Sequence, residues 1–373
     1  MQAVALNAWS AQLTWTAPLG TTRVQVFRQG RLLDDFSFAS GGLLVYTDYL
    51  LWHSTGYTYE VRAFNSSGAV IGDQSKGLTT PAQSGSFPRF YSATSFWNQP
   101  IAASPAIDPN SAAMVKAALS NYAGSANFGA NSDAWGIPVA YSNGVDKVYT
   151  VGCTRYGCNV PVTFKFARYA TPNTGSDHHL AVVNLADNSE LDMWIASYSS
   201  STDTWTAGSR YLTSAAGWGA ECALGQHCDG GTASGFAVLG GVVRPEEIAQ
   251  GHIDHALAIT TPYTRSGYIA CPATHTDGVS SDPAALPEGA HIQLDPSFNV
   301  DAQSWPQWEK VIAHALQKYG AYVNDTGGSV AIAAEANLDR GYNAWNLAGV
   351  SGTIPSLSNL PWSQFRVLQL TQC

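Results

Sequence analysis

The feature that most constrains this chain is the segment 176–197, SDHHLAVVNLADNSELDMWIAS. Apolar residues alternate with polar ones in two short runs, 178–184 and 190–197, on either side of the turn-forming residues 186–189. This pattern predicts a β-hairpin. Because successive side chains of a strand point to opposite faces, the register of the hairpin decides which residues meet.

A loop with an even number of residues, for instance one that sets Leu185 opposite Glu190, places His179, Glu190, Asp192 and Trp194 on one face. The other face is then wholly apolar and packs on a core. We therefore predict a face with an imidazole, two carboxylates and an indole, which suits binding a sugar and transferring a proton. The alternative is that this face is the solvated outside of an ordinary antiparallel sheet.

The acidic residues of this face suggest glycoside hydrolysis, which needs one protonated and one ionised carboxyl group beside the scissile bond. Glu190 and Asp192 would lie about 7 Å apart at their Cα atoms on one strand. We predict Glu190 as the acid and Asp192 as its ionised partner, with Trp194 excluding water from both. Asp177, just before the first strand, is a third candidate for catalysis.

A second imidazole, His255, lies on the more apolar face of a predicted strand at 252–259. Leaving it unpaired there costs about 1 to 3 kcal/mol, so it needs a partner. The candidates are a backbone carbonyl, Glu190, Asp192 or a metal ion, for which His179, Glu190 and His255 are the candidate ligands. No cofactor is predicted apart from this divalent metal ion.

Such a metal site would favour a different reaction, β-elimination on a uronic-acid polymer. In that reaction His179 or His255 takes the proton, and the cation neutralises the carboxylate of the substrate.

The aromatic content also favours a carbohydrate partner. The chain has 12 Trp and 17 Tyr but only 12% charged residues, a composition typical of proteins whose flat rings cover the apolar faces of sugars. Trp97, Trp194, Trp218 and Tyr198 are the candidate substrate-binding residues. Trp97 fits equally well as a core anchor.

Charge and hydropathy exclude other partners. With 18 Lys and Arg against 27 Asp and Glu, the net charge is −9, which disfavours a nucleic acid. No apolar run has the roughly 18 to 20 residues of a membrane span. The first 15 residues lack the basic and apolar regions of a secretory signal. The sequence does not indicate an oligomeric state.

The cysteines form an even set, at 153, 158, 222, 228, 271 and 373. Sequence alone does not choose among their many possible pairings. The short spacings favour Cys153 with Cys158 and Cys222 with Cys228, which leaves Cys271 for Cys373. Neither short spacing is typical of a zinc site. We expect disulfides and therefore a secreted, extracellular protein.

Residues 10–80 read as short strands separated by turns, and they resemble a fibronectin type III module. The resemblance rests on Leu13-x-Trp15 with Pro18, Val24-x-Val26-x-Arg28, Tyr57-x-Tyr59-x-Val61-x-Ala63 and Leu78-Thr79-Thr80. It implies a seven-stranded sandwich of spacer or adhesive type with no catalytic group. The aromatic loop 46–53 departs from a simple spacer and is predicted to pack against the rest of the chain.

Residues 81–86 have the composition of a linker, so we predict two domains, 1–82 and 83–373. The second shows none of the GxSxG, HExxH or GxGxxG motifs. Its patterns predict a β-sandwich, jelly-roll-like or barrel domain with a few helices, near 108–124, 244–251 and 304–320. The whole fold is thus expected to be mainly β.

These observations lead to one interpretation and two alternatives. The interpretation is a secreted enzyme that cleaves a polysaccharide, with glycoside hydrolysis as its reaction. The first alternative is a metal-assisted polysaccharide lyase. The second is a non-catalytic carbohydrate-binding or adhesive protein.

Overall fold

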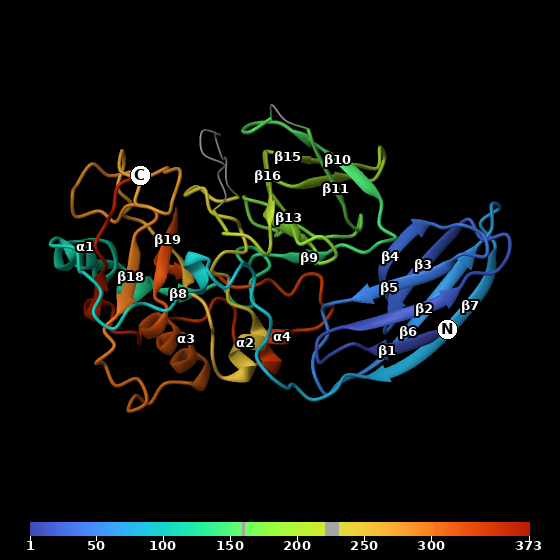
Figure 1. The fold of residues 1–373 in the computed structure, drawn as a ribbon, viewed down its shortest axis with the longest axis horizontal. Coiled ribbons are helices and arrows are strands. Elements are labelled where there is room, and N and C mark those ends of the chain that lie inside the picture. The colour runs from blue at the N-terminus through green and yellow to red at the C-terminus, as the bar shows by residue number, and fades with distance from the viewer. Residues whose placement is uncertain (159–160, 221–230) are drawn as a thin grey trace.

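The structure is a computed structural model that describes residues 1–158, 161–220 and 231–373 (Figure 1). In these residues the fold is mainly β, as predicted, with five sheets and a few short helices. Cys222, Cys228 and their predicted bridge lie outside the described residues.

The first module is a sandwich of a three-stranded sheet, β1-β2-β5, and a four-stranded sheet, β4-β3-β6-β7. Trp15 and Tyr59 are buried between the two sheets, as the fibronectin type III resemblance implies. The strands are β1 (Gln2–Ala5), β2 (Ala11–Thr16), β3 (Arg23–Arg28), β4 (Arg31–Ser37), β5 (Leu43–Asp48), β6 (Gly56–Phe64) and β7 (Val70–Thr79).

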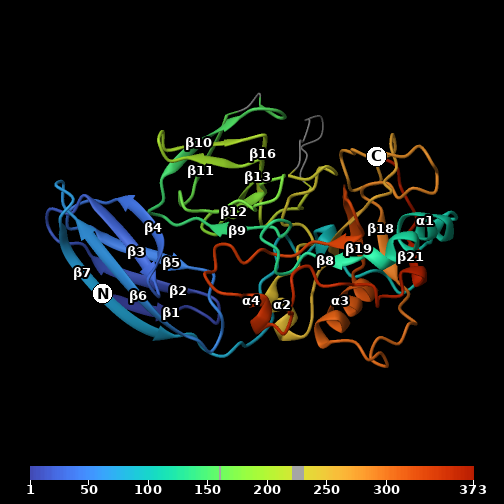
Figure 2. The same cartoon turned by 180° about the vertical axis from the view of Figure 1, so that it is seen from behind.

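The aromatic loop 46–53 packs against the rest of the chain, as predicted. The rings of Tyr49 and Tyr141 lie 5.0 Å apart, and the amide of Thr47 donates to Asn143 Oδ1 at 2.8 Å. Figures 1 and 2 show the sandwich beside the segment that carries β9. A division into domains at residue 82 stays a prediction.

Charged side chains cross the same interface. Arg168 Nη2 donates to Asp35 Oδ2 at 2.8 Å. Arg28, which is buried, donates to the backbone carbonyl of Arg340. Hydrogen bonds to buried charged groups are among the stronger ones in proteins. These two bonds therefore hold the first module against the residues that follow it in the chain.

Beyond the linker, two four-stranded sheets form a second sandwich, in the orders β16-β13-β12-β9 and β11-β10-β15-β14. Leu180, Val182, Leu191 and Met193 fill the space between them together with Trp205. The strands are β9 (Val139–Tyr141), β10 (Val148–Cys153), β11 (Val162–Lys165), β12 (Leu180–Asn184), β13 (Ser189–Trp194), β14 (Ser197–Ser199), β15 (Thr204–Ala207) and β16 (Ser209–Ser214).

A third layer is a mixed six-stranded sheet in the order β21-β18-β19-β17-β20-β8. The chain after residue 86 thus forms a sandwich joined to a mixed sheet, which refines the sequence prediction. The strands are β8 (Asn127–Phe128), β17 (Leu257–Thr261), β18 (His291–Leu294), β19 (Ala321–Thr326), β20 (Ala331–Ile332) and β21 (Phe365–Val367).

Helices cover one face of this sheet. Val311, Ile312 and Leu316 of α3 share a core with Ile292 and Val323 of the sheet. The predicted helices form, each shorter than its sequence pattern. The helices are α1 (Ser111–Ala118), α2 (Pro245–Gln250), α3 (Gln307–Lys318) and α4 (Ala344–Leu347), with 3-10 turns η1 (Phe96–Asn98), η2 (Ser120–Ser125) and η3 (Trp362–Gln364).

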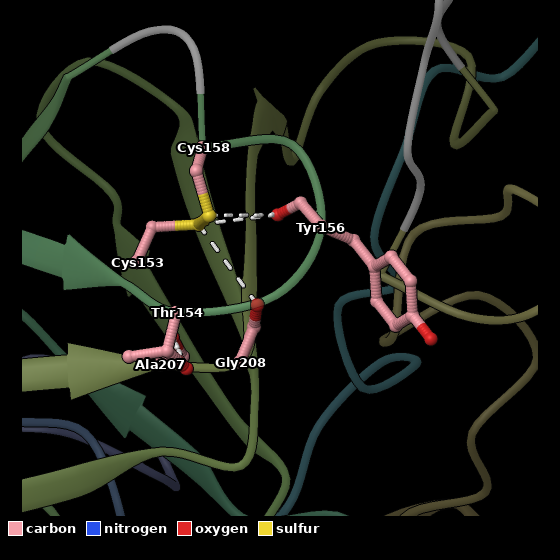
Figure 3. Close-up of a disulfide and its surroundings, with 6 residues drawn as sticks. All are labelled: Cys153, Thr154, Tyr156, Cys158, Ala207 and Gly208. Atoms are coloured by element: carbon pink, nitrogen blue, oxygen red, sulfur yellow. Dashed lines mark hydrogen bonds between the residues drawn. A yellow bond between two sulfur atoms is a disulfide. The ribbon is translucent and has the colours of Figure 1, made fainter.

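Two of the predicted disulfides form, Cys153–Cys158 and Cys271–Cys373. Figure 3 shows the first, which closes a loop after β10. In the part of the chain that the structure describes, no helix has both the length and the apolar character needed to cross a membrane.

Candidate functional site

The hairpin forms from β12 and β13, with Val183 opposite Glu190 and Ala181 opposite Asp192. Its register lies two residues from the one with Leu185 opposite Glu190, but the parity is the same. The turn contributes to this register because Asp187 Oδ1 accepts from the amide of Ser189 at 3.0 Å. Glu190 and Asp192 therefore share a face, as predicted.

At Glu190 and Asp192 this face is interior, which neither alternative predicted, whereas its end at His179 lines a cleft. Ala181 and Val183 contact a core that includes Ala258 of β17 and Tyr322 of β19. The segment 236–239 contributes to the same core. The hairpin sheet is thus covered on both faces, by the other sheet of its sandwich and by the six-stranded sheet.

Glu190 and Asp192 are both 0% exposed. Both carboxylate oxygens of Glu190 lie 3.1 Å from Tyr91 Oη, which donates to them. Asp192 Oδ2 accepts from the amide of Val238 at 2.8 Å. A substrate has no access to either group in the described structure, which argues against their predicted roles as acid and ionised partner.

The pair holds protons instead. Burial, and then the charge of Asp192, raise the pKa of Glu190 well above its ordinary value. Burial raises the pKa of Asp192 to about 7. Asp192 Oδ1 has no other hydrogen-bond partner, so a proton on Glu190 supplies its donor. The two residues form an interior acid pair.

Titratable side chains line a cleft of about 440 Å³ at the open end of the hairpin. The segment before β12 contributes Asp177 and His179 to this cleft, and the end of β19 contributes Asn324 and Asp325. Trp135, 56% exposed, stands on its rim. Amide and hydroxyl groups complete the polar lining, from Asn127, Thr232, Thr260, Thr326 and Ser329.

His179 lines the cleft, and one of its ring nitrogens has no hydrogen-bond partner. This nitrogen, Nδ1, is buried, while the backbone amide of His179 donates to Asn173 Oδ1 at 3.1 Å. Burial lowers the pKa of His179, although the charge of Asp177 opposes this shift. The imidazole is therefore neutral near pH 7 and suited to accept a proton.

The cleft also contains two carboxyl groups. Asp177 Oδ1 accepts from Trp194 Nε1 at 3.3 Å, which brings the predicted indole to the cleft. For Asp325, burial and then the charge of Asp277 raise the pKa to about 7, with a smaller contribution from Asp177. At neutral pH a large fraction of Asp325 carries a proton that it can donate.

Asp325 belongs to a group of three acids with Asp277 and Glu288. One oxygen of each lies within 4.8 Å of the others, the only such group of possible metal donors among the described residues. Glu288 is fully buried, and its Oε1 has no donor. Among the described residues the structure does not gather His179 and His255 with Glu190 in this way.

His255 lies elsewhere because β17 begins at Leu257, five residues after the start of the predicted strand and two residues beyond His255. Its Nε2 lies 3.0 Å from Glu247 Oε1 of α2, and its Nδ1 donates to the carbonyl of Ala256 at 2.8 Å. Burial by itself would raise the pKa of Glu247, but the charges of His255 and Arg244 outweigh it and lower that pKa to about 2. This pair supports α2 and has no contact with the cleft.

Three of the aromatic residues predicted to bind substrate lie outside the cleft lining. Trp97 is 1% exposed in the core between the sheets, so it cannot stack on a sugar. Tyr198 packs on Trp205, at 5.3 Å between rings, in the outer sheet of the sandwich. Trp218 packs on Phe96 at 5.8 Å and stays partly exposed, outside the cleft lining.

Sequence reasoning missed Asp325, Asp277 and Trp135. Asp277 and Trp135 lie in segments without alternation, and Asp325 ends a strand that is otherwise buried. The usable signal was the acidic residues of the turn-rich segments HTDG and PEG, together with NDTGG at the end of a strand.

No protein-family model and no curated protein matches this chain. Among solved structures it is similar to the sixth fibronectin type III domain of human fibronectin type III domain containing protein 3. The identity is 24% over 23% of this chain and 86% of that chain, with a TM-score of 0.19.

Two further solved structures are similar to the chain over comparable lengths. A Yersinia enterocolitica family 28 exopolygalacturonase is 21% identical over 26% of this chain and 21% of that chain, with a TM-score of 0.20. The fibronectin(III)-like modules of Clostridium thermocellum CbhA are 18% identical over 21% of this chain and 87% of that chain, with a TM-score of 0.17. Two of the three are domains of the type that the first module resembles.

Proposed function

We propose that this protein is a secreted polysaccharide-cleaving enzyme, a glycoside hydrolase, and that the cleft between β12 and β19 is its active site. The observation that carries the proposal is the lining of this cleft. A neutral imidazole, two carboxyl groups and an exposed indole meet there, in a space large enough for sugar units. The two disulfides support secretion.

In this proposal Asp325 is the general acid. Burial keeps a proton on its carboxyl group near neutral pH, and that proton passes to the glycosidic oxygen as the bond to the sugar breaks. Asp177 is the second carboxyl group, which activates water or attacks the sugar carbon. His179 is the neutral imidazole near Asp177, and Trp135 covers the apolar face of a sugar ring.

A metal-assisted lyase is the second candidate, and the acid group of Asp277, Glu288 and Asp325 favours it. Carboxylate oxygens at such separations suit Ca²⁺ or Mn²⁺. The cation would neutralise the carboxylate of a uronic acid, and His179 would remove the proton beside it. No catalytic step would then require a proton on Asp325.

Incubation with a panel of neutral and uronic-acid polysaccharides tests both candidates. Hydrolysis generates reducing ends without ultraviolet absorbance of an unsaturated product, and EDTA leaves its rate unchanged. Elimination generates that absorbance and stops with EDTA. Retention on a polymer without any product contradicts the enzyme proposal and indicates a binding protein.

A further inference from the structure

A disulfide-closed loop stands beside the cleft. Cys153 and Cys158 close residues 153–158, and the amides of Arg155 and Tyr156 donate to the carbonyl of Gly208 at 2.9 and 3.0 Å. The amide of Thr154 donates to the carbonyl of Ala207, the residue before Gly208, at 3.0 Å. Figure 3 shows the Tyr156 ring pointing away from the disulfide.

This loop places two side chains on Trp194. The ring of Tyr156, a residue 62% exposed, lies 5.9 Å from the indole at an interplanar angle of 30°. The guanidinium of Arg155 lies 5.4 Å from the indole centroid. Gly208 makes room for this arrangement, because a Cβ there would lie only 2.9 Å from Trp194 Cε3.

Trp194 connects the loop to the cleft. Its Nε1 donates to Asp177 Oδ1, and Asp177 lines the cleft. The ledge formed by Arg155, Tyr156 and Trp194 therefore continues from the cleft edge. A polymer that fills the cleft can extend onto this ledge.

Charge indicates what kind of sugar would bind there. The described lining of the cleft contains no Lys or Arg, so a carboxylate on a polymer bound there finds no cation inside the cleft and would meet one at Arg155. Arg155 is exposed and forms no ion pair with any described residue. A guanidinium pairs with a carboxylate through two parallel hydrogen bonds, while the rings beside it cover the sugar.

We propose that Arg155, Tyr156 and Trp194 form a subsite for a carboxylate-bearing sugar unit, so that the polymer bound in the cleft contains uronic acid. The subsite proposal rests on the proposed function in one respect, that the cleft binds a polysaccharide. It applies equally to hydrolysis and to elimination.

The test measures binding and cleavage separately. Affinity electrophoresis through polygalacturonate and through its carboxyl-reduced form compares the wild-type protein with R155Q, R155K and Y156A. We expect R155Q to weaken binding to polygalacturonate about tenfold, the loss of one charge-assisted contact, with little change on the reduced polymer. R155K should retain part of the affinity, and Y156A should weaken binding to both polymers.

R62Q is the control, because Arg62 lies over the ring of Phe27 in the first module at 4.8 Å and is already paired with Glu60 and Asp73. It should bind both polymers as the wild type does. Equal binding of R155Q and the wild type to polygalacturonate, or no binding of the wild type to it, overturns the subsite. Polymer cleavage with no preference for uronic acid would overturn the subsite alone, whereas binding without cleavage would overturn only the enzymatic function.

Discussion

The role of a carboxyl group in this protein follows from what its oxygen atoms face. Glu190 and Asp325 both have raised pKa values, and burial is the main cause in each case. Glu190 faces Tyr91 in the interior, whereas Asp325 lines the cleft. A raised pKa alone therefore does not identify a catalytic acid.

We predict that D325N lowers kcat by about a hundredfold or more, because it removes the proton donor. E190Q should retain kcat within about twofold, since the amide still hydrogen-bonds to Asp192 outside the cleft. Activity on whichever polymer the panel identifies, with circular dichroism to confirm folding, checks both variants. Loss of activity in E190Q with full activity in D325N would move the active site to the acid pair.

Residue-scale prediction succeeded where local rules decide the outcome. Strand parity alone placed His179, Glu190 and Asp192 on one face. It could not show that the six-stranded sheet covers Glu190 and Asp192 while Asp177 and His179 stay accessible. That outcome depends on Ala258 and Tyr322, far away in the sequence.

At the scale of elements, the neighbouring strands β13 and β16 carry two opposed leucines that differ in burial. Leu191 is fully buried in the sandwich core, and its cross-strand partner Leu212 on β16 is 49% exposed. The two side chains lie on the same face of the sheet, since directly opposed residues do. They therefore form a matched pair for measuring what burial contributes.

L191A should lower the free energy of unfolding by about 2 to 5 kcal/mol, because it leaves a cavity in the core. L212A should lower it by about 1 kcal/mol or less, since the half-exposed side chain loses little buried area. Urea denaturation of both variants gives the two values. Similar losses for L191A and L212A would contradict the burial seen here.

The elements were predictable to the extent that their pattern is periodic. The alternation in 178–197 gave the hairpin, and the apolar stripe near 304–320 gave α3. The strand predicted at 252–259 begins only at Leu257, because Ala256 donates to the carbonyl of Trp97 rather than to a strand partner. The six-stranded sheet mixes segments from β8 to β21, an order that no local pattern encodes.

At the scale of the whole molecule, a carboxyl pair spans the interface between the first module and the rest. Asp34 of β4 and Asp146, after β9, are both buried, and each has an oxygen without a donor. Burial raises the pKa of Asp34. Burial, and then the charge of Asp34, raise the pKa of Asp146 to about 9. The pair is held together by a shared proton.

Stability should therefore depend on pH in a defined direction. Unfolded aspartates titrate near about pH 4, so the contribution of the pair is fully present below that pH and is lost as pH rises toward about 9. We predict a higher Tm at pH 5 than at pH 8 for the wild type. D146N, whose amide donates at any pH, should be the more stable protein at pH 8.

Asp203 provides the control for this measurement, because it lines the same groove as Asp34 and Asp146. Hydrogen bonds from Lys147 and Tyr198 lower its pKa to about 2, so it stays ionised from pH 5 to pH 8. D203N should shift Tm equally at both pH values in calorimetry. A wild type with its higher Tm at pH 8 would contradict the shared proton.

The contacts that join the first module to the rest of the chain also determine how tension would travel through the molecule. The side chains of Arg28 and Arg168 and the backbone amide of Thr47 form hydrogen bonds across the junction, in addition to the covalent connection at 81–86. A force applied to the first module is therefore shared among several contacts and transmitted to Asn143 and Arg340. The candidate cleft would then move together with the first module, because these contacts leave no freely flexible connection between the two.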